Sequence, residues 1–152
     1  MRIAVLVSAV LCVAVVQNQP ALDQAKEEEE ITRVLDQFMA TFNRSDAAAH
    51  LATYHFPHYR LASGKMTVLE KPGAESEARW NEQMKRLQAA GWDHSQWTRR
   101  RIVHLSDSKA HVDTEFARYR QDGSLIKKYE SLYILTKVNG HWGVKMRSSF
   151  AE

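Results

Sequence analysis

The sequence predicts an α+β fold, in which a curved antiparallel sheet carries helices packed on its concave face. Three observations support this class. Up to about residue 90, apolar residues recur mostly at helical spacing, apart from one short hairpin. From Trp97 onward, apolar and polar residues alternate as they do in strands. Two-residue turns at Asp122-Gly123 and Asn139-Gly140 join the later strands into a meander.

The first residues differ in composition from the rest of the chain. Arg2 precedes an uncharged apolar run, residues 3–16, which ends at the polar sequence QNQP. This arrangement is typical of a secretory signal peptide, and the run is shorter than the ~20 residues of a membrane span. We therefore expect a signal peptide over residues 1–21 and one domain over residues 22–152, in a secreted or periplasmic protein. The alternative is a retained membrane anchor.

Helical spacing places a long helix at the start of the domain. Its apolar stripe consists of Ile31, Val34, Leu35, Phe38 and Phe42. The glutamates at residues 27–30 lie in its early turns, where the helix dipole favours negative charge. We expect Asn43 to close this helix in the left-handed conformation, and Ser45 to cap a short alanine-rich helix over residues 46–53.

A hairpin and a second sizeable helix follow. Residues 59–62 and 66–69 flank a tight turn at Ser63-Gly64-Lys65. Pro72-Gly73 opens the next helix, and Gly91 ends it. Four strands complete the chain, over residues 97–105, 109–120, 125–138 and 141–150.

The two-residue turns also predict which side chains face the helices, because they set the register of the strands. With Asn139-Gly140 as the turn, Tyr133 pairs with Met146 and Ser131 pairs with Ser148. The inward face then carries polar groups among hydrophobes, namely Thr114, Arg118, Tyr129, Ser131, Tyr133 and Ser148 beside Phe116. Through the turn at Asp107, Arg101 joins this face. The opposite face collects charged residues, with Arg147 among them.

These inward polar groups predict a ligand pocket. Buried hydroxyls need hydrogen-bond partners, and a curved sheet that faces helices leaves room for a ligand to supply them. Tyrosines and arginines at the rim suit a small amphipathic molecule with an acidic group. The expected ligand-binding residues are His55, Arg60, Trp80, Arg101, Thr114, Phe116, Arg118, Ser131 and Ser148. The alternative is that these residues bond one another or lie in water at strand ends.

The stretch YHFPHYRLASGK holds the best candidates for chemistry. Histidine is the natural acid or base near neutral pH, so His58 is the expected catalytic residue of an enzyme, with Tyr133 or Tyr129 as its partner. We expect no metal and no other cofactor, because the chain has no H-E-x-x-H motif and its only cysteine, Cys12, lies in the apolar leader. A net charge of +3 without a basic stripe predicts no nucleic-acid partner.

The element order, with the sequences FNRSD, YHFPHYRLASG and YILTKVNGHWGVKMRSS, resembles the nuclear transport factor two-like, SnoaL-like superfamily over about residues 22–150. The resemblance implies a cone of curved sheet closed by helices over a deep pocket, and a homodimer that packs through the sheet. Members include ketosteroid isomerase, scytalone dehydratase, polyketide cyclases and non-enzymatic binding domains, so the fold does not select a function. The carboxylate base of the isomerase would fall near Leu61-Ala62, where none is present.

The sequence therefore predicts an exported domain that binds a small amphipathic molecule. One alternative is a cofactor-free lyase, isomerase or cyclase that uses a pocket His/Tyr pair. Another is a dimeric protein-interaction module that uses the charged sheet face.

Overall fold

The computed structural model describes residues 23–151 and contains three helices and six strands within that range. The helices are α1 (Gln24–Asn43), α2 (Ala47–Leu51) and α3 (Ala74–Ala89). The strands are β1 (Tyr54–Ala62), β2 (Lys65–Leu69), β3 (His94–Leu105), β4 (Lys109–Tyr119), β5 (Leu125–Val138) and β6 (His141–Ser149). The predicted signal peptide, with Cys12, lies outside the described residues.

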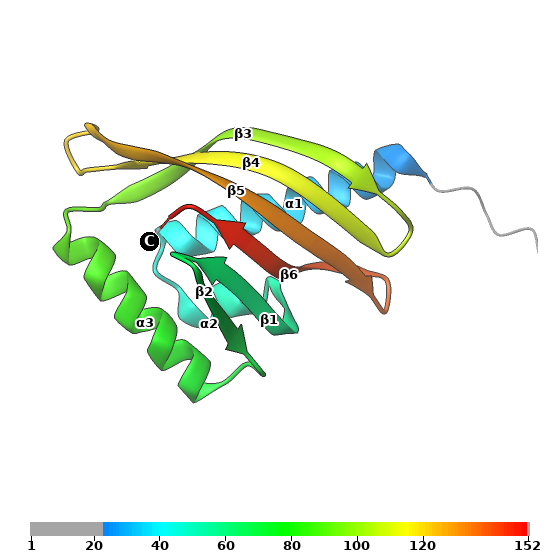
Figure 1. Cartoon of the computed structure of the whole chain (residues 1–152), viewed down its shortest axis with the longest axis horizontal. Coiled ribbons are helices and arrows are strands. Elements are labelled where there is room, and N and C mark those ends of the chain that lie inside the picture. Colours follow the sequence, from blue (N-terminus) through cyan, green and yellow to red (C-terminus); the bar gives the residue numbers. More distant parts are fainter. Residues whose placement is uncertain (1–22, 152) are drawn as a thin grey trace, which may run out of the picture.

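All six strands form one curved sheet in the order β2-β1-β6-β5-β4-β3, so the predicted α+β class is confirmed (Figure 1). The meander from β3 to β6 is antiparallel, as predicted. One pairing was not predicted, because β1 lies parallel to β6. This pairing brings the histidine stretch of β1 beside the C-terminal strand, 80 or more residues later in the chain.

Helix α1 lies along one face of the sheet, in contact with β3 and β6 (Figure 1). Its apolar stripe is buried as predicted and packs in a core with residues of the meander, namely Ile31, Leu35 and Phe38 with Ala110, Val112, Tyr133, Leu135 and Val144. Helix α3 is attached by a second cluster, in which Trp80 and Met84 pack on Phe42 and Trp92. The helices therefore cover the inner face and one end of the sheet.

The junction between α1 and α2 differs from the prediction. Ser45, not Asn43, has the left-handed backbone (φ 54°), and Asp46 caps α2 by accepting a hydrogen bond from the Ala49 amide. Asn43 is still helical, and its side-chain amide bonds both the N–H and the C=O of Ser95. The asparagine is therefore used to fasten α1 to β3.

A β-bulge in β6 changes the predicted faces of the sheet. Leu135 pairs with Val144 as predicted, but Ile134 then pairs with Met146, so Lys145 is an extra residue in β6. One extra residue reverses the side of every residue beyond it. Tyr133 consequently pairs with Arg147 rather than Met146, and Arg147 faces inward.

Shifts in the pairing register of β3 with β4 determine which face of the sheet each arginine of β3 occupies. Arg101 pairs with Asp113 and Arg99 with Glu115, whereas Arg100 pairs with the buried Thr114. The prediction that Arg101 joins the inner face is therefore wrong, because the register shift between Ile102 and His104 reverses its side.

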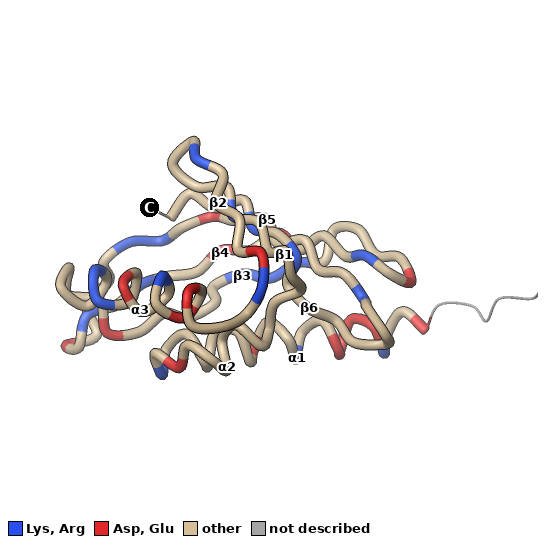
Figure 2. The backbone as a smooth tube through the Cα atoms, turned by 90° about the horizontal axis from the view of Figure 1, so that it is seen from below, with Lys and Arg blue, Asp and Glu red and all other residues tan. Residues whose placement is uncertain are grey.

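The outer face of the sheet is a surface of paired charges. Arg99 lies 3.2 Å from Asp113 and 3.4 Å from Glu130, and Lys128 lies 3.2 Å from Glu115. Basic and acidic residues also alternate along α3 (Figure 2). Such ion pairs at the surface contribute little stability each.

Candidate functional site

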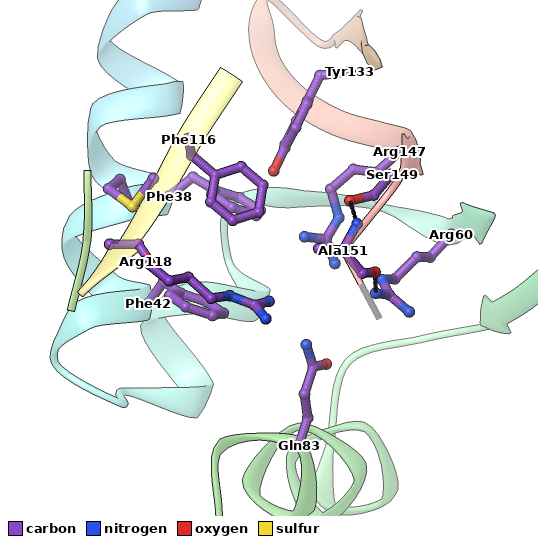
Figure 3. Close-up of a pocket in the computed structure, with 12 residues that line it drawn as sticks. Phe38, Phe42, Arg60, Gln83, Phe116, Arg118, Tyr133, Arg147, Ser149 and Ala151 are labelled. Carbon is purple, nitrogen blue, oxygen red and sulfur yellow. Dashed lines mark hydrogen bonds between the residues drawn. The ribbon is translucent and has the colours of Figure 1, made fainter. Parts of the chain in front are cut away.

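The site is a pocket enclosed by α1, α3, β1 and the inner face of the sheet. A narrow inner part has about 20 Å³ of space that the centre of a water molecule can reach, and a wider outer part has about 470 Å³. Arg60, Gln83 and Arg147 line both parts, so the two are neighbours. Figure 3 shows Arg60, Arg118 and Arg147 pointing into the same space, with Gln83 approaching from α3.

Arg147 extends from β6 into a cluster of aromatic rings. Its guanidinium carbon lies 5.1 Å from the centre of the Phe38 ring and 5.9 Å from the rings of Tyr54 and Tyr133. One of its terminal nitrogens lies 3.5 Å from the Tyr54 hydroxyl. Its Nε is buried without a partner among the described residues. Cation–π contacts hold this charge in place but satisfy no N–H in the plane of the guanidinium.

Arg118 enters the pocket from β4. It is only 7% exposed and lies over the rings of Tyr129 and Phe116, at 4.6 and 5.7 Å. Its Nε also has no partner among residues 23–151. Burial lowers the pKa of Arg118, but a guanidinium stays protonated at neutral pH.

Arg60 completes the cationic group from β1. It donates a 2.7 Å hydrogen bond to the carbonyl oxygen of the buried Ala151, which holds the end of the described chain against the pocket. Burial lowers the pKa of Arg60, and the positive charge of Arg147 lowers it further.

These three arginines have no acidic neighbour in the inner pocket. Within residues 23–151, no aspartate or glutamate lines that part, and Glu82 lines only the outer part. By contrast, each arginine at residues 99–101 on β3 pairs with an aspartate. The inner pocket is therefore strongly positive, with donor groups that remain available to an anion.

His58 is a neutral residue in the wall of the outer pocket. It is 1% exposed, and its ring stacks on that of Tyr54 with 3.8 Å between centres. Its Nδ1 lies 3.0 Å from the Val144 carbonyl oxygen. A carbonyl only accepts, so Nδ1 carries the proton and Nε2 has a free lone pair. Burial, with the charge of Arg147, lowers the pKa of His58 to about 3.

A buried hydrogen-bonded chain supports Tyr54 from behind. The His50 Nε2 lies 3.1 Å from the Tyr54 hydroxyl, and the His50 Nδ1 lies 3.2 Å from the Phe38 carbonyl oxygen. Burial and the charge of Arg147 lower the pKa of His50 well below its usual value. His50 is therefore neutral with its proton on Nδ1, and Tyr54 donates to Nε2. The oxygen of Tyr54 is left to accept from Arg147.

Six of the residues predicted for the site line the pocket. They are His58, Arg60, Trp80, Phe116, Arg118 and Tyr133. Thr114, Tyr129 and Ser131 face inward as predicted but lie behind the pocket wall. Thr114 donates to the Ser131 carbonyl oxygen (2.9 Å), and the Ser131 hydroxyl donates to that of Ser149 (2.8 Å). Thr114 and Ser131 therefore form hydrogen bonds within the sheet, which is the alternative that the sequence left open, and the Tyr129 ring lies against Arg118.

Three predicted site residues lie elsewhere. Ser148 is opposite Leu132 on the outer face, because the bulge at Lys145 reverses its side. Arg101 is also outside, where it lies 3.5 Å from Asp113. The His55 ring lies against Gly143 and bonds the Thr136 hydroxyl at 2.9 Å. The predicted placements of Ser148, Arg101 and His55 at the pocket are therefore wrong.

Sequence reasoning missed several residues that shape the pocket. Arg147 was expected on the outer face, and a bulge leaves no clear signal in alternating residues. Ser149 takes the place predicted for Ser148 for the same reason. Gln83 is one of many polar residues on α3, and His50 lies in an alanine-rich helix without a motif. Phe38 also lines the pocket, and for this residue the sequence did hold a signal, namely its place in the apolar stripe of α1.

Within residues 23–151, no three His, Cys, Asp or Glu side chains are grouped so that they could hold a metal ion. None of the helices in this range is long and apolar enough to span a membrane.

The fold and the sequence place the chain in a family. The sequence matches the family described as NTF2-like protein (DUF6841) over residues 27–147, so the chain belongs to it. The resemblance to the nuclear transport factor two-like superfamily is confirmed. A comparison with curated proteins found no match.

Solved structures agree with this assignment. An NTF2-like protein of unknown function from Shewanella oneidensis is 19% identical, with a TM-score of 0.64, over 82% of this chain and 98% of the other. An NTF2-like protein with a cystatin-like fold from Novosphingobium aromaticivorans is 13% identical, with a TM-score of 0.68, over 84% and 82%. A ketosteroid isomerase-like protein from Erwinia carotovora atroseptica is 20% identical, with a TM-score of 0.60, over 82% and 95%. At these identities the likeness concerns the fold alone.

Proposed function

We propose that this chain binds a small amphipathic carboxylate, with the acid group among Arg60, Arg118 and Arg147. One observation carries the proposal. Three guanidinium groups converge on a pocket whose inner part has no acidic side chain among residues 23–151. A carboxylate accepts paired hydrogen bonds from the guanidinium fork, so it fits these donors better than a neutral group does.

Electrostatics supports an anionic ligand. Like charges that are partly removed from water repel one another, and burial already lowers the pKa of Arg60 and Arg118. An anion in the inner pocket would relieve that repulsion and supply acceptors for the buried Nε atoms of Arg118 and Arg147. A neutral ligand could supply acceptors but would leave the repulsion between the arginines in place.

The outer pocket supports an apolar body for the ligand. Its volume of about 470 Å³ falls within the ~300–1,000 Å³ that is typical of small-molecule sites. Tyr54, Leu69 and Trp80 supply apolar and aromatic walls there. Burying an apolar body against them would add hydrophobic stabilisation to the charge interaction.

The alternative, an acid–base enzyme, has weaker support. With its pKa lowered to about 3, His58 is a weak base at neutral pH and carries no proton to donate from Nε2. Tyr129 lies against Arg118 and does not line either part of the pocket. Ligand binding without catalysis is therefore the better supported of the two functions.

Calorimetry with matched probes tests the proposal. We would titrate the purified protein with 3-phenylpropanoate and straight-chain alkanoates of four to eight carbons, and with 3-phenylpropanamide as the neutral counterpart. We expect at least one acid to bind at least about tenfold more tightly than its amide, because a charge-assisted pair is lost in the amide. Equal binding of acid and amide, or no heat with any acid, would overturn the proposal.

Variants locate the binding site in the same assay. Arg118→Gln should weaken binding of the acid but not of the amide, whereas Arg101→Gln, on the outer face, should change neither. Glu152 directly follows Ala151, which lines the inner pocket. Titrating Glu152→Gln with the same acid and amide therefore tests whether the carboxylate of Glu152 affects their binding. A wild-type preference for acid over amide that persists in Arg118→Gln would place the site elsewhere.

Two further proposals concern the location and the oligomeric state of the protein. We propose that the protein is exported, on the basis of the apolar run that follows Arg2. N-terminal sequencing of the protein from its source should show a new start near residue 22, and an intact Met1 in a cytoplasmic fraction would contradict export.

We also propose a homodimer, on the basis of the family resemblance. Sedimentation equilibrium should give a mass of about twice that of the mature chain, and a single-chain mass at all concentrations would contradict it.

A further inference from the structure

His58 presents an acceptor in a pocket whose other polar groups are mainly donors. Its Nδ1 proton is committed to the Val144 carbonyl oxygen, and its Nε2 is buried with no partner among residues 23–151. A buried acceptor without a donor destabilises the folded protein. The ring is 1% exposed, so a donor can reach that lone pair only from the outer pocket that the ring lines. The natural donor is a ligand that occupies the outer pocket, which His58 lines.

The arginines near His58 also determine which charge the donor group of the ligand can carry. Arg60 and Arg147 line the pocket together with His58, and their charges, added to burial, keep its ring neutral. A ligand ammonium group at this point would meet the repulsion of two guanidinium groups. A hydroxyl or amide N–H donates without a positive charge, so the pocket selects a neutral donor.

We infer that the ligand is a hydroxylated carboxylate, with its acid group on the arginines and a hydroxyl that donates to the Nε2 of His58. This inference rests on the proposed function, because it names the substrate class of the same pocket. Arg60 and Arg147 line the outer part together with His58, so a molecule in that part lies beside both arginines and the histidine. It also assigns His58 a binding role that its neutral state supports.

A set of isosteres tests the inference on the wild-type protein. We would titrate it with the 2-, 3- and 4-hydroxy isomers of 3-phenylpropanoate, with 3-hydroxy-3-phenylpropanoate, and with the fluoro counterpart of each. Fluorine resembles a hydroxyl in size but donates no hydrogen bond. We expect one hydroxy isomer to bind about tenfold more tightly than its fluoro counterpart, as one hydrogen bond to a buried acceptor predicts. We expect 3-amino-3-phenylpropanoate, an ammonium, to bind more weakly than the unsubstituted acid.

The variant His58→Phe assigns the effect to the histidine. Phenylalanine can keep the stack on Tyr54 but has no lone pair, so the hydroxy-to-fluoro ratio should fall to about one while the unsubstituted acid still binds. If this variant does not fold, the wild-type ratios decide alone. The inference is overturned if no isomer gains more than about threefold from its hydroxyl, or if the gain persists in His58→Phe.

These outcomes are separable from failure of the proposed function. If the unsubstituted acids bind better than their amides but hydroxyls add nothing, carboxylate binding stands and the hydroxylated class falls. If no acid binds, both fall.

Discussion

Arg147 lies directly opposite Tyr133 across β5 and β6, with the guanidinium carbon 5.9 Å from the centre of the Tyr133 ring. The extra residue Lys145 creates this relationship, because in a regular strand Met146 would take the inward position. The bulge thus exchanges an apolar wall residue for a cation. A core without a ligand would be better filled by methionine, which supports a binding role for the arginine.

Replacing Arg118 by methionine should leave the protein as stable as the wild type, or more stable. Arg118 is buried without an acidic partner among the described residues, and exchange of a buried charged group for an apolar one of similar size is often neutral or stabilising. We expect the free energy of unfolding to fall by no more than about 1 kcal/mol, or to rise by up to ~4 kcal/mol. Urea denaturation at pH 7 measures it.

Arg100→Met is the matched control, because Arg100 pairs with Asp36 and lies over the Trp97 ring. It should be the more destabilising of the two. A loss in Arg118→Met larger than that in Arg100→Met would show that Arg118 is a structural residue.

Acid should destabilise the protein through His58. The folded pKa of about 3 lies below the unfolded value of about 6.5, so between these pH values the unfolded chain binds the extra proton. This stability is complete above pH 6.5 and is lost as the pH falls toward 3, by about 1.4 kcal/mol per pH unit. The free energy of unfolding, measured by urea denaturation from pH 7 to pH 4, should show a pH slope that His58→Phe reduces by about 1.4 kcal/mol per pH unit.

His50, whose pKa is also lowered by burial, adds a slope of the same sign that remains in His58→Phe. Equal pH slopes in the wild type and in His58→Phe would mean that the His58 ring is charged in the folded state.

Glu27 should stabilise the protein at neutral pH. It accepts hydrogen bonds from Lys137 (2.7 and 2.8 Å) and from the Trp142 indole N–H (2.6 Å), and these lower its pKa. Glu27→Gln should lower the free energy of unfolding by about 2 kcal/mol at pH 7. The loss should shrink as the pH falls from 4.5 through the folded pKa, since the wild-type carboxylate is then protonated as well.

The control is Glu29→Gln, on the exposed side of α1 in a pair with Arg33. It should change the urea midpoint little at any pH. A pH-independent loss in Glu27→Gln would indicate lost packing rather than lost charge.

Gly143→Ala should destabilise the protein because the His55 ring occupies the place of the new methyl group. The ring must move and lose its 2.9 Å bond to Thr136, so we expect a loss of about 1–3 kcal/mol. In a His55→Ala background the same substitution should be nearly neutral. Thermal denaturation of the four proteins gives the coupling, and additive losses would contradict the proposed clash.

Much of the fold could be read from local pattern. The stripe from Ile31 to Phe42 predicted the buried face of α1, and Asn139-Gly140 predicted the pairing of Leu135 with Val144. The pocket walls on β4 and β5 followed by alternation, so Phe116, Arg118 and Tyr133 were assigned correctly. The starts of β1 and β3 were predicted five and three residues too late, at Tyr59 and Trp97, because β1 also pairs with the distant β6 and β3 pairs along the whole of β4.

The sequence by itself determined the order of helices and strands and the four-stranded meander, because spacing and turn chemistry are local properties. Only the tertiary structure decided that Lys145 is bulged, that β1 lies beside β6, and that Arg147 and His58 meet at one pocket. A bulge shifts the alternation by one residue, and a parallel pairing joins segments far apart in the chain. Both depend on how the whole sheet packs against α1, so neither leaves a local signal.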